Sequence, residues 1–208
     1  MGIEEVLSIF LNKGVEKKWF DISTIGKLDK SCCTNSKIEV IDFDKAEEIH
    51  RKKCGSTSLK SCDALKFMIE EERIDFIEMK SSKNILKNPK IDTNKKLQKQ
   101  IDKFDFTAKI SDSLHILTAI SNQREIDLSG KERKLIKNIP KQAILLTDLN
   151  FEENVINTIA FTFDFLANMS TNIKDLLQDE INKLGEDNIN NLLQPKLMNC
   201  KEIEAFYN

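Results

Sequence analysis

The chain has 208 residues, which suits one ordinary domain or one domain with a helical extension. Its apolar fraction of 40% supports a real core and argues against wholesale disorder, and its apolar runs are too short to span a bilayer. Because 32 Lys and Arg nearly balance 34 Asp and Glu, the net charge argues neither for nor against a nucleic-acid partner.

The N-terminal region and the cysteines both indicate a reducing environment. The chain opens with Glu4 and Glu5, not with a basic segment and an apolar run, so we expect no secretory signal, no membrane partner and a cytoplasmic (intracellular) location. The cysteines are odd in number and lack CxxC spacing: Cys32, Cys33, Cys54, Cys62 and Cys200. We therefore expect free thiols and no zinc site.

The N-terminal part of the chain predicts a helix, a loop and a short strand followed by a helix. Apolar residues recur at helical spacing over residues 2–19, whereas residues 21–36 are rich in Ser, Thr and Gly and predict a loop. A short alternating run at residues 37–43 precedes a second helical stretch at residues 44–53. The Gly-Ser-Thr-Ser segment 55–58 then breaks the pattern.

Two strand-like runs follow and predict a β-hairpin. They are Cys62 to Ile69 (CDALKFMI) and Ile74 to Lys80 (IDFIEMK), and the charged connector 70–73 between them is short enough for a hairpin turn. A lysine-rich loop comes next, over residues 81–92.

The remainder predicts a helix, a buried strand and a further helix, over residues 93–120, 142–149 and 151–184. Helices and strands in this order indicate an α/β class with a mixed central β-sheet and flanking helices. We expect a single domain, with its core at about residues 37–150 and helical extensions at residues 1–36 and 151–208.

Acid-X-Lys triplets begin at Glu16, Glu78 and Glu132, and in so charged a chain their spacing alone carries no information. The first and last lie in polar segments typical of a surface. Only Glu78-Met79-Lys80 ends a β-branched and aromatic strand, so its context distinguishes it.

The hairpin geometry then places a third ionisable residue, Asp63, beside Glu78 and Lys80. If the turn is symmetric about Glu71 and Glu72, residue 69 pairs with residue 74, and Asp63 pairs with Lys80. Directly paired residues share a face of the sheet, so Asp63, Glu78 and Lys80 lie on one face at the end away from the turn. A slip of one residue would move Asp63 to the opposite face.

Two carboxylates and an ammonium group at one strand end suit phosphodiester hydrolysis. Mg²⁺ prefers carboxylate oxygens and water as ligands, and a bound metal ion activates its water and neutralises charge in the transition state. A neighbouring lysine can orient that water. We expect the backbone carbonyl of Met79 to point towards the metal between Glu78 and Lys80.

Asp63, followed fifteen residues later by Glu78-Met79-Lys80 on the next strand, resembles the PD-(D/E)XK nuclease superfamily. The strings GSTSLKSCDALKF and RIDFIEMKSSK are similar to archaeal-type Holliday junction resolvases and restriction-endonuclease-like folds. The resemblance covers roughly residues 44–120 and extends at most to residue 149. It implies a restriction-endonuclease-like core, Mg²⁺ or Mn²⁺ bound by Asp63 and Glu78, and Lys80 as the catalytic lysine. Cys62 stands where this family often has proline.

In the same family the first core helix often supplies a further acidic ligand. Glu47 is a candidate because it lies on one stripe with Phe43 and His50. If the first strand is instead residues 37–43, Glu4 or Glu5 of the first helix could take this place. His50 as a metal ligand would resemble the viral cap-snatching endonucleases, whose helix supplies a histidine.

Lysines gather directly after the proposed site, between Lys83 and Lys109, and could follow a phosphate backbone. The candidates for nucleic-acid binding are Lys83, Lys87, Lys95, Lys96 and Lys99. Such a run is also typical of a solvated surface.

The leading hypothesis is therefore a metal-dependent endonuclease acting on DNA or RNA. A non-catalytic nucleic-acid- or protein-binding module that keeps the same fold is the alternative, and a helical regulatory protein with an accidental motif is a third. A homodimer or another protein partner remains open.

Overall fold

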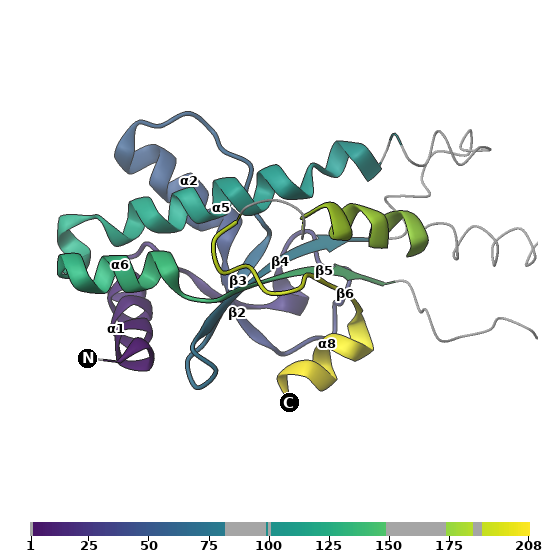
Figure 1. Cartoon of the computed structure of the whole chain (residues 1–208), viewed down its shortest axis with the longest axis horizontal. Helices are drawn as coiled ribbons and strands as arrows, with labels where there is room; N and C mark the ends of the chain where they lie inside the picture. The colour runs from purple at the N-terminus through teal and green to yellow at the C-terminus, as the bar shows by residue number, and fades with distance from the viewer. Residues whose placement is uncertain (1, 82–98, 100, 149–173, 185–188) are drawn as a thin grey trace, which may run out of the picture.

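The computed structural model describes residues 2–81, 99, 101–148, 174–184 and 189–208. Strands and helices alternate along these residues (Figure 1). The strands are β1 (Ile22–Thr24), β2 (Glu39–Asp42), β3 (Ala64–Met68), β4 (Arg73–Lys80), β5 (Lys141–Thr147) and β6 (Lys196–Asn199). The helices are α1 (Ile3–Glu16), α2 (Phe43–Cys54), α5 (Phe106–Ser121), α6 (Gly130–Asn138) and α8 (Cys200–Tyr207), with 3-10 turns η1 (Ile25–Lys27), η2 (Asp102–Phe104) and η3 (Arg124–Ile126).

The strands form one mixed sheet in the order β1-β2-β3-β4-β5-β6. Neighbours from β1 to β4 are antiparallel, whereas β5 is parallel to β4 and β6 is parallel to β5. The parallel register pairs Lys80 with Thr147 and Thr147 with Asn199, so β4, β5 and β6 end at the same edge of the sheet. The predicted α/β class with a mixed sheet and flanking helices is confirmed.

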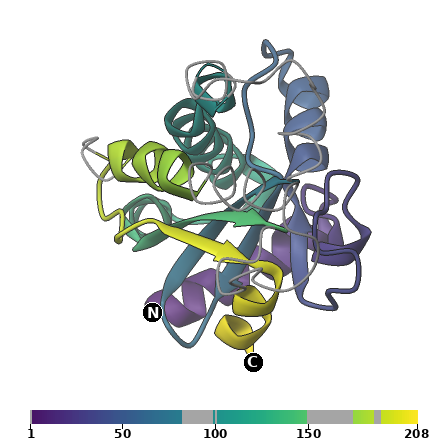
Figure 2. The same cartoon turned by 90° about the vertical axis from the view of Figure 1, so that its right-hand side faces the viewer.

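Helices cover both faces of the sheet and create two apolar clusters. The larger cluster lies under α1, α2, α5, α6 and the helical residues 174–184, and includes Phe10, Phe43, Phe76, Ile116, Ile136 and Ile181. The smaller cluster lies under η1 and α8 and includes Ile25, Ile77, Met79 and Ile203. Figure 2 shows α2, α5 and residues 174–184 on one side of the sheet and α8 on the other.

Local capping explains where the helices near the β4–β6 edge begin and end. The Asp42 carboxylate accepts the Lys45 N–H at 3.2 Å and starts α2, which ends at Gly55 with a φ of 62°. Asn199 caps α8 in a reciprocal pair with Glu202. These caps fix where α2 begins on one face of the sheet and where α8 begins on the other.

The predicted helix at residues 93–120 is interrupted. Asp105 has a φ of 46°, which ends the turn η2 and lets α5 begin afresh at Phe106. Residues 82–98 and 149–173 lie outside the described residues, and with them most of the predicted lysine-rich loop and of the helix 151–184.

Strands β1 and β6 lie in the ranges 1–36 and 151–208, where the sequence pattern predicts helical extensions. The sheet therefore extends beyond residues 37–150. Strands this short give too little alternation for a sequence pattern to identify them.

The hairpin register differs from the predicted one by two residues. Met68 pairs with Arg73 and Ala64 with Ile77, so Asp63, one residue before β3, lies opposite Glu78 and not opposite Lys80. The turn comes one residue earlier than expected because Glu72 adopts a φ of 51° and its N–H closes the turn on the Ile69 carbonyl at 3.1 Å. A shift of two residues keeps every side chain on its predicted face.

The prediction that all five cysteines are free thiols is wrong. Cys33 and Cys200 form a disulfide across a sequence separation of 167 residues, while Cys32, Cys54 and Cys62 are free. The pairing arises because Cys200 directly follows β6, whose end lies beside the loop after η1. Among the helices of the described residues, none is long and apolar enough to cross a membrane.

Candidate active site

Asp63 is fixed by backbone groups of two neighbouring elements. Its carbonyl accepts the Phe43 N–H at the start of α2 at 3.1 Å, and its carboxylate Oδ2 accepts the Met79 N–H of β4 at 2.6 Å. The preceding Cys62 N–H donates to Ser113 Oγ of α5 at 2.9 Å. The Asp63 side chain is therefore buried in a defined position at the entrance to β3.

Glu78 lies opposite Asp63 near the end of β4 and is only 1% exposed. It shares its sheet face with Ile74 and Phe76 of the larger apolar cluster, whereas Ile77 and Met79 belong to the smaller cluster on the other face. The two acidic side chains consequently meet on the face that α5 covers.

Three lysines from different parts of the chain hold the two carboxylates. Lys109 of α5 places Nζ 2.7 and 2.8 Å from the two Glu78 oxygens, and Lys80 pairs with Glu78 Oε1. Lys30, in the loop after η1, places Nζ 3.1 Å from Asp63 Oδ1. The Lys80 ammonium also lies 4.9 Å from the ring centre of Phe104. Asp63, Glu78 and Lys80 thus meet at one strand end, as predicted.

A third acidic residue, Asp44, reaches the site through Lys30. It belongs to the first turn of α2, and its Oδ2 lies 2.5 Å from the Lys30 Nζ that also contacts Asp63. Its other oxygen accepts the Ser61 hydroxyl at 2.8 Å. Asp44 is therefore the residue of α2 whose carboxylate is connected to Asp63.

Burial and the neighbouring charge of Asp63 raise the pKa of Glu78, while contact with Lys80 and Lys109 acts in the opposite direction. Burial alone would lower the pKa of Lys109, but the Glu78 carboxylate outweighs it and the pKa is raised. The site therefore requires positive charge close to the two carboxylates, and lysine ammonium groups supply it here.

The Met79 N–H points towards Asp63. In a strand the N–H and C=O of one residue lie on the same side, because a hydrogen-bonded residue uses both towards the same partner. The Met79 N–H donates to Asp63, so we expect its carbonyl to lie on that side as well. A carbonyl in that position would add a fifth oxygen to the four of the Asp63 and Glu78 carboxylates.

Glu47 and His50 do not join Asp63 and Glu78 in a compact group. Among the described residues, one group of three or more His, Cys, Asp or Glu side chains has its ligand atoms within 4.8 Å of one another. It consists of Cys32, Cys33 and Cys200 and includes neither Glu47 nor His50.

Both side chains are buried but face other partners. Glu47 Oε1 accepts the Leu59 N–H at 3.2 Å, and His50 Nδ1 lies 3.3 Å from Ser56 Oγ. Glu4 and Glu5 are exposed in the first turn of α1.

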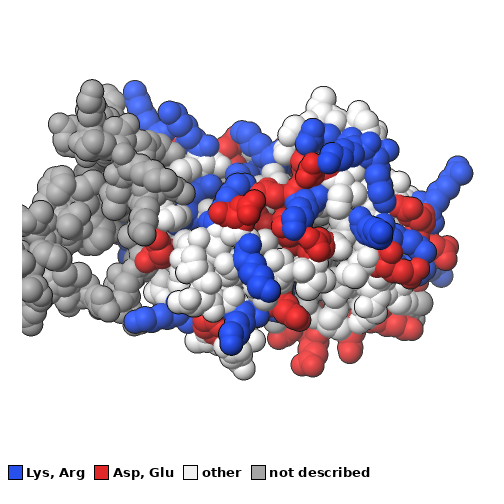
Figure 3. Space-filling model, turned by 180° about the vertical axis from the view of Figure 1, so that it is seen from behind, with Lys and Arg blue, Asp and Glu red and all other residues white. Residues whose placement is uncertain are grey.

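The predicted nucleic-acid-binding lysines are mostly outside the described residues, namely Lys83, Lys87, Lys95 and Lys96. Lys99 is described and is exposed. On the face seen in Figure 3, described Lys and Arg side chains are interspersed with Asp and Glu. The described part of that face therefore carries mixed charge and is not a basic surface.

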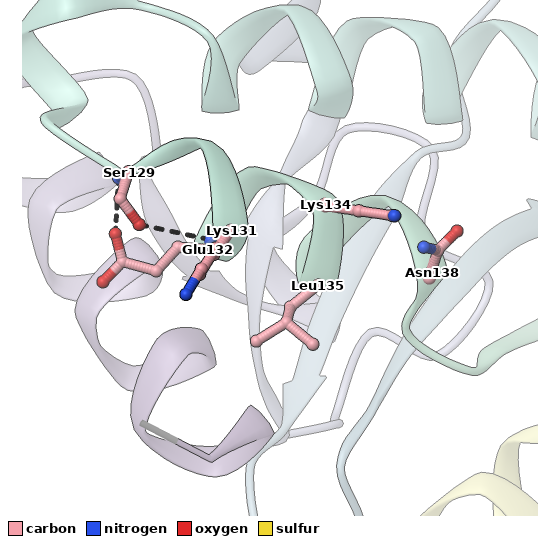
Figure 4. Close-up of a pocket in the computed structure, with 6 residues that line it drawn as sticks. All are labelled: Ser129, Lys131, Glu132, Lys134, Leu135 and Asn138. Atoms are coloured by element: carbon pink, nitrogen blue, oxygen red, sulfur yellow. Dashed lines mark hydrogen bonds between the residues drawn. The ribbon is translucent and has the colours of Figure 1, made fainter.

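A surface hollow of about 500 Å³ lies along α6, away from the carboxylate pair. Figure 4 shows the residues that line it. Among them, Ser129 and Glu132 are hydrogen-bonded to each other and cap the start of α6. Leu135 and two lysine side chains complete most of the wall. The polar groups here serve the helix end, so the hollow offers no catalytic set.

Sequence reasoning missed the roles of Lys30, Asp44 and Lys109. Lys109 belongs to the lysine-rich stretch after the motif, and this was the only feature of the sequence that pointed to a role for it. Lys30 and Asp44 lie in a loop and at a helix start, where neither periodicity nor spacing points to the site.

Comparison of the chain with protein-family models, with curated proteins and with solved structures finds no match. The proposed function therefore depends on the residues of this site and on the sequence resemblance.

Proposed function

We propose that the chain is a metal-dependent nuclease of the PD-(D/E)XK kind that hydrolyses phosphodiester bonds of DNA or RNA. The observation that carries the proposal is the buried pair Asp63 and Glu78, which meets Lys80 at the end of the β3–β4 hairpin. Such burial of two adjacent carboxylates is costly unless cations compensate them.

The donor set fits a hard divalent cation. Asp63, Glu78 and the Met79 carbonyl offer oxygen atoms, which Mg²⁺ and Mn²⁺ prefer over nitrogen or sulfur. These residues would hold the ion, which when bound supplies an activated water and neutralises charge on the phosphate.

The chain's own residues account for the other requirements of hydrolysis. Lys80 ends β4 beside Glu78, so its ammonium can orient a water or stabilise the negative charge that develops on the phosphate. Lys109 fixes the Glu78 carboxylate from the helix side, and the Met79 N–H fixes that of Asp63. Both carboxylates are thereby oriented before substrate arrives.

A non-catalytic nucleic-acid- or protein-binding module is the second candidate, and one observation favours it. Asp63 already pairs with Lys30, and Glu78 with Lys80 and Lys109, so lysines of the described residues compensate the charge of the site without a metal ion. A module of this kind would keep the fold and the ion pairs but would cleave nothing.

Cleavage with defined metal content separates the two candidates. The purified chain is incubated with labelled single- and double-stranded DNA and RNA in Mn²⁺, Mg²⁺ or EDTA. We expect metal-dependent cleavage of at least one substrate, lost in Lys80→Ala and Asp63→Asn, with EDTA abolishing it in the wild type. Circular dichroism checks that both variants remain folded.

Lys66→Ala is the matched control, because Lys66 belongs to the same hairpin and its ammonium contacts the Glu39 carbonyl, away from the carboxylate pair. Its cleavage rate should equal that of the wild type. Binding of nucleic acid without cleavage under every metal condition would favour the second candidate.

A further inference from the structure

A cluster of three cysteines lies at the same edge of the sheet as the acidic pair. The sulfur atoms of Cys32, Cys33 and Cys200 all lie within 4.8 Å of one another. Cys33 and Cys200 are joined as a disulfide, and Cys32 Sγ lies 3.8 Å from Cys33 Sγ. Two of these residues are adjacent in a loop, and the third starts α8, so the fold itself assembles the cluster.

We propose that Cys32, Cys33 and Cys200, with the Cys33–Cys200 disulfide reduced, form a binding site for a thiophilic metal ion, with Zn²⁺ as the natural occupant. Tetrahedral zinc has Zn–S bonds of about 2.3 Å, which places two thiolate ligands about 3.8 Å apart. The Cys32–Cys33 sulfur separation has this value. The Cys200 sulfur lies within 4.8 Å of the Cys32 sulfur, and once the disulfide is reduced Cys33 and Cys200 can move apart to the separation that zinc requires.

The surroundings of the cluster favour a soft ion over a hard one. The cluster borders the smaller apolar core, with Leu28, Ile38 and Met198 among its members. Thiolates in such surroundings select Zn²⁺ or Cu⁺, whereas the oxygen donors at Asp63 and Glu78 select Mg²⁺ or Mn²⁺. Cys32 is half-buried, so a fourth position can be filled by water or by an external ligand.

The conversion between the two states balances in electrons and protons. A dithiol reductant supplies two electrons and two protons to the Cys33–Cys200 bond and becomes a cyclic disulfide, leaving two thiols. Binding of Zn²⁺ then forms three metal–sulfur bonds and releases the three thiol protons to solvent.

Either link ties the loop after η1 to α8. This loop carries Lys30, whose ammonium contacts both Asp63 and Asp44. A metal ion at the cluster therefore takes over the structural role of the disulfide under reducing conditions and keeps Lys30 at the acidic pair. Metal binding by these three sulfur atoms does not depend on nuclease activity.

Titration of the reduced full chain tests this proposal. The protein is reduced with excess dithiol under nitrogen, freed of reductant, and titrated with Co²⁺ followed by Zn²⁺. We expect one Co²⁺ per chain with sulfur-to-cobalt charge-transfer absorption, displaced by Zn²⁺ but not by excess Mg²⁺. The oxidised chain should show no such absorption.

Serine variants assign the ligands. Cys32→Ser and Cys200→Ser should each weaken Zn²⁺ binding by at least about tenfold and reduce the charge-transfer band, because the loss of a direct ligand costs no less than the loss of an outer-shell partner. Cys54→Ser is the matched control, since Cys54 is exposed and lies outside the cluster, and it should bind like the wild type.

In a reduced chain that stays folded, two outcomes would overturn the proposal: no Co²⁺ absorption in the wild type, or equal Zn²⁺ affinity in Cys32→Ser and Cys54→Ser. If reduction unfolds the chain, recovery of its circular dichroism with one equivalent of Zn²⁺ supports the site. A reduced chain that stays unfolded with Zn²⁺ contradicts it.

Discussion

Lys109 holds both carboxylate oxygens of Glu78, with its Nζ 2.7 Å from one and 2.8 Å from the other. This contact joins α5 to the end of β4 and places one ammonium group across the whole carboxylate. Since Glu78 is buried, the pair contributes mainly by preventing an uncompensated charge in the core.

Replacing Lys109 by Met should therefore destabilise the fold. Among the described residues, Glu78 would then keep the pairing with Lys80 alone, and breaking a buried pair from one side costs about 3 kcal/mol in the free energy of unfolding. Urea denaturation measures this loss. Lys103→Met, a change of an exposed lysine before α5, should leave the free energy within about 0.5 kcal/mol of the wild type.

The double variant Lys109→Met with Glu78→Gln distinguishes pairing from packing. Removing both charges should recover most of the loss, because no unpaired carboxylate remains. If the costs of the two single changes simply add, the contact between Lys109 and Glu78 contributes nothing to stability.

Divalent ions should stabilise the wild type if Asp63 and Glu78 bind them. A ligand at about 100 times its Kd raises the free energy of unfolding by about 2.7 kcal/mol, which appears as a higher Tm in Mn²⁺ than in EDTA. The rise should shrink at acidic pH, where protons compete for Glu78, whose pKa is raised by burial and by Asp63.

Asp63→Asn should abolish the Tm rise by removing one ligand charge. Asp21→Asn serves as its control because Asp21 is an exposed aspartate paired with Lys45, outside the site. An equal Tm rise in Asp63→Asn and in the wild type would place the metal elsewhere and would remove this support for the proposed function.

The alternation of the hairpin was predictable from sequence because a strand has a fixed period of two. Ile74, Phe76 and Glu78 lie on one face whatever the pairing partner is. The pairing itself was less predictable, since it depends on where the turn begins. Glu72 adopts a left-handed backbone conformation, which a glutamate in the sequence does not predict. The observed register therefore differs from the predicted one by two residues.

The partners of the acidic pair could not be predicted from sequence for a different reason. Lys30 and Lys109 lie far from Asp63 and Glu78 along the chain, and the fold alone brings them into contact. The same holds for Cys33 and Cys200, whose pairing needs the end of β6 beside the loop after η1. Charge and spacing along the sequence identify a motif, but they do not identify the residues that compensate its charge.

Glu72→Gly should stabilise the hairpin. A non-glycine residue in the left-handed region costs about 1 kcal/mol, and glycine avoids that cost, although it adds freedom to the unfolded chain. The net gain should be about 0.5 kcal/mol in urea denaturation. Glu71→Gly, one residue earlier and without a positive φ, should instead lower stability. A loss in Glu72→Gly as large as that in Glu71→Gly would contradict the observed turn geometry.

Asp75 and Tyr207 connect the opposite face of β4 to α8, and Tyr207→Phe tests this connection through its pH dependence. The Tyr207 hydroxyl donates to the buried Asp75 carboxylate at 2.9 Å, and Arg73 Nε holds the other oxygen at 2.9 Å. Losing a hydrogen bond to a charged group should lower the free energy of unfolding by about 2 kcal/mol at neutral pH.

The sign of the pH effect follows from the pKa of Asp75, which burial raises against the opposing effects of Arg73 and Tyr207. An acid with a raised pKa contributes stability when it is protonated, and this contribution is lost as pH rises through the folded-state pKa. Removing the hydroxyl raises that pKa further, so the loss in Tyr207→Phe should be larger at about pH 7 than at about pH 4. Ile203→Val removes only apolar packing under the same helix, so its loss should be equal at both pH values. A pH-independent loss in Tyr207→Phe would mean that the hydroxyl does not stabilise the ionised carboxylate.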